Sequence, residues 1–104
     1  MKNKNIEKLI NEHKILVFIK GDKKQPLCGF SNQVINILNN FNIEYHTINV
    51  LQDLEMKKGI KEYSDWPTIP QIYIDGEFIG GAEILTNLYE KCALGEILEK
   101  ALNS

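Results

Sequence analysis

Cys28 is the residue of this 104-residue chain whose setting is best suited to chemistry. It ends the stretch KGDKKQPLC, and the residues after it, GFSNQV, are typical of the start of a helix. Three residues later, where a redox dithiol would need its second sulfur, stands Ser31, whose hydroxyl cannot close a disulfide. A helix N-terminus and a nearby lysine both lower the pKa of a thiol, and Lys20 ends the preceding strand. The pattern predicts one reactive thiolate, with the Ser31 hydroxyl in reach of the sulfur.

Cys92 is the second cysteine of the sequence. Two cysteines are too few for a disulfide scaffold, and their number favours a reducing compartment. Cys92 falls near the end of a predicted helix that should lie away from the Cys28 turn. We interpret it as a structural or incidental thiol, with modification of its sulfur as the alternative. His13 and His46 are isolated in the sequence, so no zinc site with a usable ligand spacing is predicted.

The elements that must position Cys28 are indicated by hydrophobic periodicity. Residues 15–20 form an apolar run of strand length, as in a strand buried on both faces, and residues 29–41 carry apolar side chains at helical spacing. The two prolines of WPTIP exclude a helix there, and Asp75-Gly76 suits a hairpin turn. The remaining expected elements are a first helix around residues 6–10, a strand at 45–50, a charged, broken helical stretch at 53–63, hairpin strands within 71–79, and helices at 82–91 and 95–102.

The order of these elements predicts the fold. Two parallel strands joined through a helix, followed by an antiparallel hairpin, give an α/β architecture with a central four-stranded mixed sheet and helices on both faces. This is the architecture of the thioredoxin fold. We find no internal repeat and no linker, so residues 1–104 are expected to form a single domain.

Composition excludes several classes of function. A net charge of -2 gives no electrostatic basis for binding a nucleic-acid backbone. No apolar run approaches the length of a membrane span, and the N-terminal residues lack the features of a secretory signal. We therefore expect neither nucleic acid nor membrane as a partner, although a longer precursor with a trimmed targeting segment stays open.

Two motifs, KGDKKQPLCGFS and WPTIPQIYIDGEFIGG, resemble those of the single-domain monothiol glutaredoxins. The resemblance extends over about residues 6–100. It implies that glutathione binds beside Cys28 and that two protomers hold a 2Fe-2S cluster between them, the apoprotein being a monomer. Ligand counting agrees, because such a cluster usually needs four thiolates. Cys28 supplies two in a symmetric dimer, and two glutathione molecules would complete the set.

The same resemblance assigns a glutathione site. Lys20 and Lys57 would bind the glycyl carboxylate, and Phe30 would cover the site. Thr68, Ile69 and a cis Pro70 would present main-chain groups to the tripeptide, as in a short antiparallel ladder. The glycine-initiated helix that follows would bind a carboxylate through its free N–H groups. Its contributing residues would be Gly81, Ala82 and Glu83, where relatives have an aspartate in place of the glutamate.

Three functions remain in competition at this level. The first is a cluster carrier that serves iron-sulfur apoproteins and assembly factors. The second is a glutathione-dependent thiol-disulfide oxidoreductase, in which Cys28 is the catalytic nucleophile and turnover is weak because the loop GDKKQP would displace the incoming glutathione. The third is an interaction module without a cofactor. The resemblance points to the mitochondrial matrix, with the cytoplasm as the alternative compartment.

Overall fold

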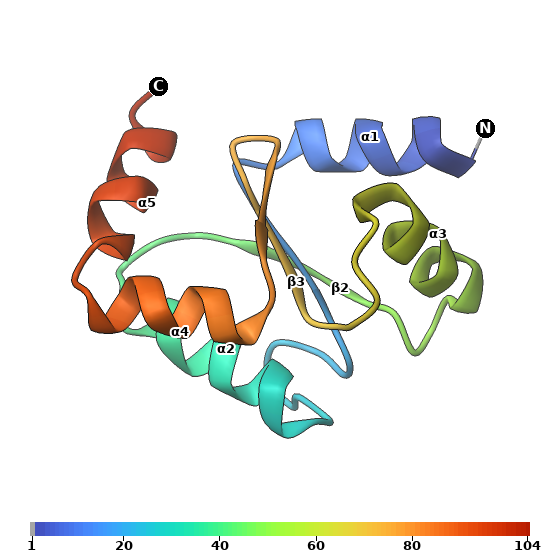
Figure 1. Ribbon diagram of the computed structural model, residues 1–104, viewed down its shortest axis with the longest axis horizontal. Helices are drawn as coiled ribbons and strands as arrows, with labels where there is room; N and C mark the ends of the chain where they lie inside the picture. The colour runs from blue at the N-terminus through green and yellow to red at the C-terminus, as the bar shows by residue number, and fades with distance from the viewer. Residues whose placement is uncertain (1) are drawn as a thin grey trace.

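The computed structural model describes residues 2–104, with side chains from residue 5 onward. A four-stranded mixed sheet in the order β2-β1-β3-β4 forms its centre (Figure 1). Strand β1 pairs in parallel with β2 and antiparallel with β3, which in turn pairs antiparallel with β4. The strands are β1 (Ile15–Ile19), β2 (His46–Asn49), β3 (Gln71–Ile74) and β4 (Glu77–Gly80). The predicted mixed sheet and thioredoxin fold are confirmed.

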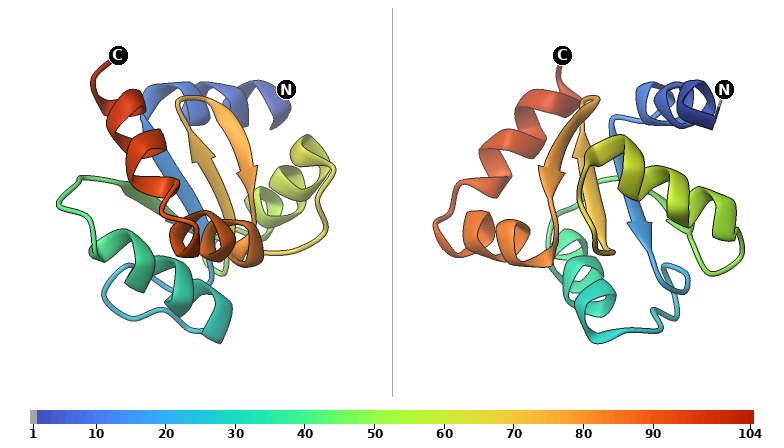
Figure 2. Two further views of the ribbon diagram at one scale, coloured as in Figure 1. Left: turned by 60° about the vertical axis from the view of Figure 1, so that its left-hand side comes forward. Right: turned by 45° about the vertical axis from the view of Figure 1, so that its right-hand side comes forward.

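Five helices cover the two faces of this sheet (Figures 1 and 2). Buried side chains of α2, α4 and α5 pack with one face in a first core cluster, which includes Val17 and Ile72. Helices α1 and α3 lie on the opposite side, where Ile6, Ile60 and Phe18 belong to a second cluster. The helices are α1 (Lys2–Glu12), α2 (Gly29–Asn39), α3 (Leu54–Ser64), α4 (Ala82–Glu90) and α5 (Leu94–Leu102).

Helix α3 corrects one expectation, because the stretch predicted to be broken is a continuous helix of 11 residues. The Asp53 side chain caps its first turn by accepting the N–H of Met56 at 3.0 Å. Gly59 is a packing position of this helix. A Cβ placed there would lie 2.9 Å from the Cδ1 atom of Ile6, so the glycine allows α1 to approach closely.

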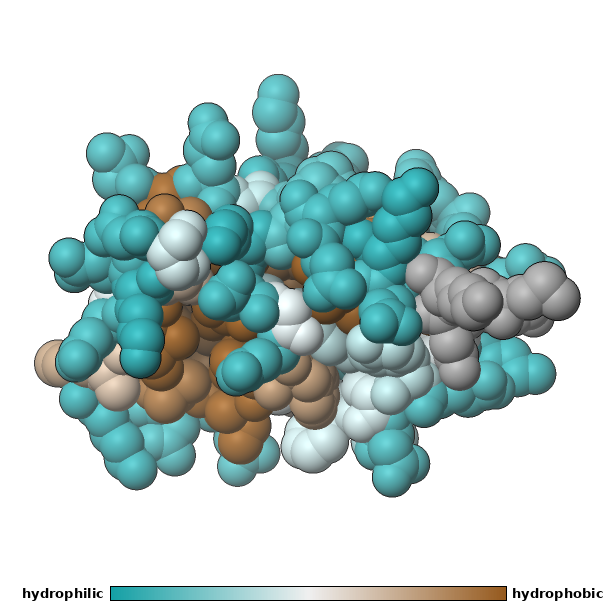
Figure 3. Space-filling view, turned by 90° about the horizontal axis from the view of Figure 1, so that it is seen from above, coloured by the Kyte–Doolittle hydropathy of each residue, from teal (hydrophilic) through white to brown (hydrophobic). Residues whose placement is uncertain are grey.

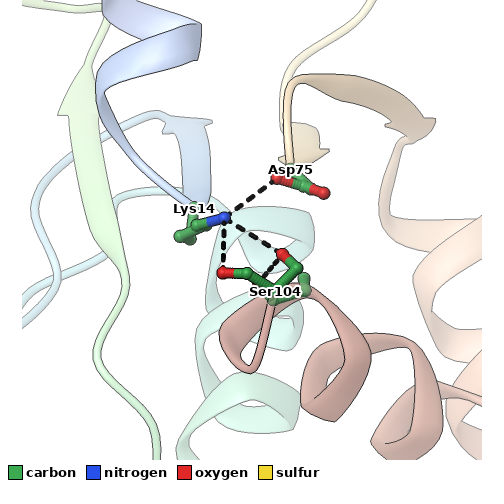
Figure 4. Close-up of polar contacts among 4 residues, drawn as sticks. Lys14, Asp75 and Ser104 are labelled. Atoms are coloured by element: carbon green, nitrogen blue, oxygen red, sulfur yellow. Dashed lines mark hydrogen bonds and ion pairs between the residues drawn. The ribbon is translucent and has the colours of Figure 1, made fainter.

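Lys14 joins three segments at the end of the fold opposite the Cys28 turn. Its ammonium donates to the Asp75 carboxylate at 3.3 Å and to the Ser104 hydroxyl at 3.1 Å (Figure 4). This contact links the start of β1, the hairpin turn and the end of the chain.

The face seen in Figure 3 is mostly hydrophilic, with hydrophobic side chains showing between the polar ones. None of the helices in residues 2–104 has the length and apolar character needed to cross a bilayer.

Candidate functional site

Cys28 is the N-cap residue of α2. Its backbone is extended, with φ -142° and ψ 155°, and its sulfur accepts the Ser31 N–H at 3.3 Å. This places a sulfur where capping residues usually carry an oxygen. The side chain is partly exposed. The sulfur therefore faces the positive end of the helix while remaining open to a ligand.

Ser31 holds the sulfur from a buried position. Its Oγ lies 3.1 Å from the sulfur of Cys28 and accepts the main-chain N–H of Lys20 at 3.1 Å. Because that second contact occupies a lone pair, the hydroxyl hydrogen is free to point to a thiolate. Burial alone raises the pKa of Cys28. Hydrogen bonds from the Ser31 hydroxyl, from the Ser31 N–H and from the Phe30 N–H, together with the charge of Lys20, outweigh this and hold the pKa below its ordinary value.

The loop before Cys28 is folded back and fixed at both ends. Leu27 N–H donates to the Lys20 carbonyl at 2.8 Å, and Gly21 N–H donates to the side-chain oxygen of Asn49 at 3.0 Å. At the tip, the Lys23 ammonium lies 4.0 Å from the centre of the Tyr45 ring and also donates to the Tyr45 carbonyl. The loop is therefore anchored at both ends of the edge strand β2, on Asn49 and on Tyr45, which directly precedes the strand.

A cavity of about 460 Å³ lies beside the Cys28 turn. This volume is within the range of small-molecule sites. Its walls come from Lys20, Phe30 and Lys61, from the segment 66–70, and from residues 81–84 at the start of α4. Cys28 itself is not a lining residue, but Lys20 and Phe30, which are its neighbours at the site, are.

Segment 66–70 forms one wall of this cavity. The Ile69–Pro70 bond is cis, as the family resemblance implied. Within residues 2–104, the N–H and C=O of Ile69 make no hydrogen bond to another main-chain group. Gly81 packs against this segment, since a Cβ there would lie 3.3 Å from the Pro70 carbonyl oxygen. An extended peptide could therefore pair with Ile69 from inside the cavity.

The residues predicted for the glutathione site line the cavity with two exceptions, Cys28 and Lys57. Lys57 does not line the cavity, whereas Lys61, which is four residues further along α3, does. Sequence reasoning missed Lys61, although a spacing of four residues places both lysines on one helical face. Trp66 also lines the cavity, and its ring meets that of Phe78 edge to face, with the ring centres 5.6 Å apart. The remaining predicted residues that line it are Lys20, Phe30, Thr68, Ile69, Pro70, Gly81, Ala82 and Glu83.

Cys92 lies outside this site, in the connection between α4 and α5. It is exposed and has a left-handed backbone, with φ 60°. Its N–H donates to the Tyr89 carbonyl at 3.1 Å, as in the residue that follows a helix. Among the described residues, no group of three or more His, Cys, Asp or Glu side chains is placed to hold a metal ion.

Comparison with known proteins gives consistent results. A family model described as glutaredoxin matches residues 15–79. A monothiol glutaredoxin of Synechocystis, ycf64-like, is 52% identical over 99 residues, which are 95% of this chain and 92% of that protein. Monothiol glutaredoxin-S14, chloroplastic, of Arabidopsis thaliana is 46% identical, and the match covers 95% of this chain but 57% of that protein. The mitochondrial glutaredoxin-related protein 5 of Danio rerio is 45% identical over 93% of this chain and 63% of its own length.

Solved structures agree in fold. The solution structure of reduced poplar apo GrxS14 superposes with a TM-score of 0.83 at 44% identity, covering 97% of this chain and 93% of that one. A buckwheat glutaredoxin solved as a complex with glutathione gives a TM-score of 0.85 at 21% identity, covering 97% of this chain and 90% of that one. At that identity the second likeness concerns the fold alone.

Proposed function

Since this chain belongs to the glutaredoxin family as a monothiol member, we propose that it carries a 2Fe-2S cluster as cargo between two protomers, using Cys28 and bound glutathione. The clusters would be delivered to iron-sulfur apoproteins or received from assembly factors. The observation that carries the proposal is a partly exposed thiol of lowered pKa at a helix N-terminus, beside a cavity of about 460 Å³.

The donor chemistry of the site fits iron. Iron-sulfur clusters are held by thiolates, and the contacts of Cys28 favour the thiolate form. One chain is insufficient, because the described residues offer no cluster of three or more potential ligands. A symmetric dimer supplies two Cys28 sulfurs, so two more are required. Glutathione held in each cavity would bring one thiol beside each Cys28.

The cavity also fits the chemistry of glutathione, a tripeptide with two carboxylates. Lys20 and Lys61 supply cationic groups in its lining, and within residues 2–104 the Ile69 main chain is bonded to no other main-chain group. The lining also includes the start of α4, where free N–H groups attract an anion. Gly81, the N-cap residue there, has no side chain that could accept from these N–H groups. Glu83 lines the same end and is suited to the amino group of the γ-glutamyl residue.

Anaerobic reconstitution with iron, sulfide and glutathione tests this proposal. We expect a coloured dimer with visible absorption, converted to a colourless monomer when the cluster is removed. Cys28→Ser should abolish the absorption. Cys92→Ser is the matched control, because Cys92 lies in the connection between α4 and α5. If Cys92→Ser bleached the protein, or if colour formed without glutathione, the proposed ligand set would be wrong.

A second candidate function uses the same thiolate. In a glutathione-dependent oxidoreductase, the Cys28 thiolate attacks the glutathione sulfur of a mixed disulfide and releases the client thiolate. A second glutathione thiolate then attacks the Cys28–glutathione disulfide, which regenerates the Cys28 thiolate and releases oxidised glutathione. The lowered pKa of Cys28 favours this activity. Rapid turnover of a glutathionylated substrate, without cluster formation, would support it over the carrier.

The compartment of the protein is a separate prediction from its proposed function. The relatives include proteins named as mitochondrial and as chloroplastic. The mitochondrial matrix, with the cytoplasm as alternative, stays a prediction from the sequence motifs. Immunolocalisation of the native protein, or fractionation of the source cells, would test it.

A further inference from the structure

Gln71 is a polar residue that is fully buried at the start of the central strand β3. Its main chain belongs to the sheet, where it pairs with Phe18 of β1. Burying a carboxamide is unfavourable unless its donors and its acceptor are all satisfied. The partners of this side chain therefore indicate what it is for.

Both hydrogens and the oxygen of the Gln71 amide have polar partners among the described residues. The Nε2 group donates to the Trp66 carbonyl at 3.1 Å and to the Thr68 carbonyl at 3.2 Å. The Oε1 atom accepts the hydroxyl of Tyr73 at 3.2 Å. Both amide hydrogens are thus directed to the segment that forms one wall of the cavity.

Tyr73 fixes which way round the amide lies. Its hydroxyl is a donor to Oε1, so a flipped amide would place oxygen against two carbonyl oxygens and nitrogen against a donor. Burial raises the pKa of Tyr73 to about 12. The hydroxyl therefore keeps its proton at neutral pH and remains a donor.

No competing main-chain contact holds these two carbonyls. Within residues 2–104, neither the Trp66 nor the Thr68 carbonyl accepts a main-chain N–H. The segment is attached to α3 through the Trp66 N–H, which donates to the Lys61 carbonyl at 3.2 Å. Beyond that point, among residues 2–104, the Gln71 amide supplies the hydrogen bonds that join the Trp66 and Thr68 carbonyls to the sheet.

We propose that Gln71 is a positioning residue for glutathione, because its amide sets the path of residues 66–70 and so the exposure of the Ile69 main chain to the ligand. This inference rests on the proposed function, since it assumes that glutathione occupies the cavity. Cys28 is not involved: its sulfur is held by Ser31, Phe30 and Lys20, none of which Gln71 contacts through its side chain.

The test compares Gln71→Met with wild type by calorimetric titration with reduced glutathione. Methionine has a similar length but cannot donate to the two carbonyls. We expect the dissociation constant to rise about tenfold, as for the loss of roughly one well-placed interaction. The pH profile of Cys28 alkylation by iodoacetamide should stay unchanged. A merely structural role would not separate these two measurements.

Leu98→Ala is the control for general destabilisation. Leu98 of α5 is buried in the first core cluster. Its truncation should lower the free energy of unfolding without changing glutathione binding. If Leu98→Ala weakened binding as much as Gln71→Met, or if folded Gln71→Met bound glutathione like wild type, the inference would be overturned. If wild type itself bound no glutathione, the proposed function would fail instead.

Two further measurements apply if Gln71→Met does not fold. Tyr73→Phe keeps the amide but removes the hydroxyl that orients it, and should weaken glutathione binding by a smaller factor than tenfold. In wild type, the Gln71 Nε2 protons should exchange slowly with solvent by NMR. Rapid exchange of these protons, or unchanged binding by folded Tyr73→Phe, would contradict the inference.

Discussion

Replacing Ser31 with alanine would remove one oxygen atom that serves two neighbours. The hydroxyl lies 3.1 Å from the Cys28 sulfur and accepts the Lys20 N–H at 3.1 Å. A hydrogen bond to a charged group contributes about 1.5–3 kcal/mol. Because the sulfur is partly exposed, we take the lower end of that range. The main-chain N–H of residue 31 remains available to the sulfur after the substitution.

The expected result is a higher pKa for Cys28. A loss of about 1.4 kcal/mol corresponds to a tenfold smaller thiolate population at a pH below the pKa. Alkylation by iodoacetamide near neutral pH should therefore slow by about tenfold, while the rates converge at high pH, where both proteins carry the thiolate. Leaving the Lys20 N–H without its partner should also lower the free energy of unfolding by about 1–3 kcal/mol.

Ser64→Ala is the matched control. The Ser64 hydroxyl donates to the Ile60 carbonyl at 2.9 Å within α3, so its removal deletes a partly buried serine oxygen away from the sulfur. We expect the alkylation profile of this variant to overlay that of wild type. If Ser31→Ala also gave the wild-type profile, the hydroxyl would not be stabilising the thiolate, and the explanation of the lowered pKa would be wrong.

Three other measurements test separate parts of the structure. Lys61→Ala should weaken glutathione binding a few-fold, since an exposed ion pair contributes about 1 kcal/mol. The effect should exceed that of Lys57→Ala, because Lys61 lines the cavity and Lys57 does not. Equal effects of the two substitutions would contradict this. The pKa of His46 is lowered, first by burial and then by a neighbouring histidine and lysine. The folded protein therefore binds fewer protons than the unfolded chain, and urea unfolding should show stability falling as the pH drops below about 6.5, less steeply in His46→Gln. Gly21→Ala should lower the free energy of unfolding by about 1–3 kcal/mol, since φ is +93° and a Cβ would lie 2.6 Å from main-chain atoms. At Gly29 a Cβ meets nothing within 4 Å, so Gly29→Ala should shift the urea midpoint little.

Local features of the site could be predicted from the sequence because they are complete within a few residues. Cys28 and Ser31 lie three positions apart at a helix start, and this spacing alone brings the hydroxyl to the sulfur. The mixed sheet also followed from local signals, since an apolar run, a crossover helix and a two-residue turn leave few topologies. The contributions of Lys20 and of the helix start needed only the adjoining strand and turn.

Other features depend on how distant elements pack, which periodicity does not encode. Lys57 and Lys61 share a helical face, so only the position of α3 over the sheet decides which one reaches the cavity. Gly59 admits Ile6 of α1, a contact that the local pattern around residue 59 does not indicate. Gln71 follows a proline at the start of a strand, and nothing in the alternation of residues indicates that the segment before it folds over its amide.

The sulfur and the cavity are held by separate sets of contacts, and this separation has a measurable consequence. Ser31 fixes Cys28 from α2, whereas Gln71 fixes segment 66–70 of the cavity wall from β3. Substitutions without shared partners usually combine additively, within about 0.3–0.5 kcal/mol. Ser31→Ala should therefore change alkylation and leave glutathione affinity alone, Gln71→Met should do the reverse, and the double variant should show both effects at full size. A larger coupling in either measurement would contradict this separation, because the thiolate and the cavity wall would then respond as one unit.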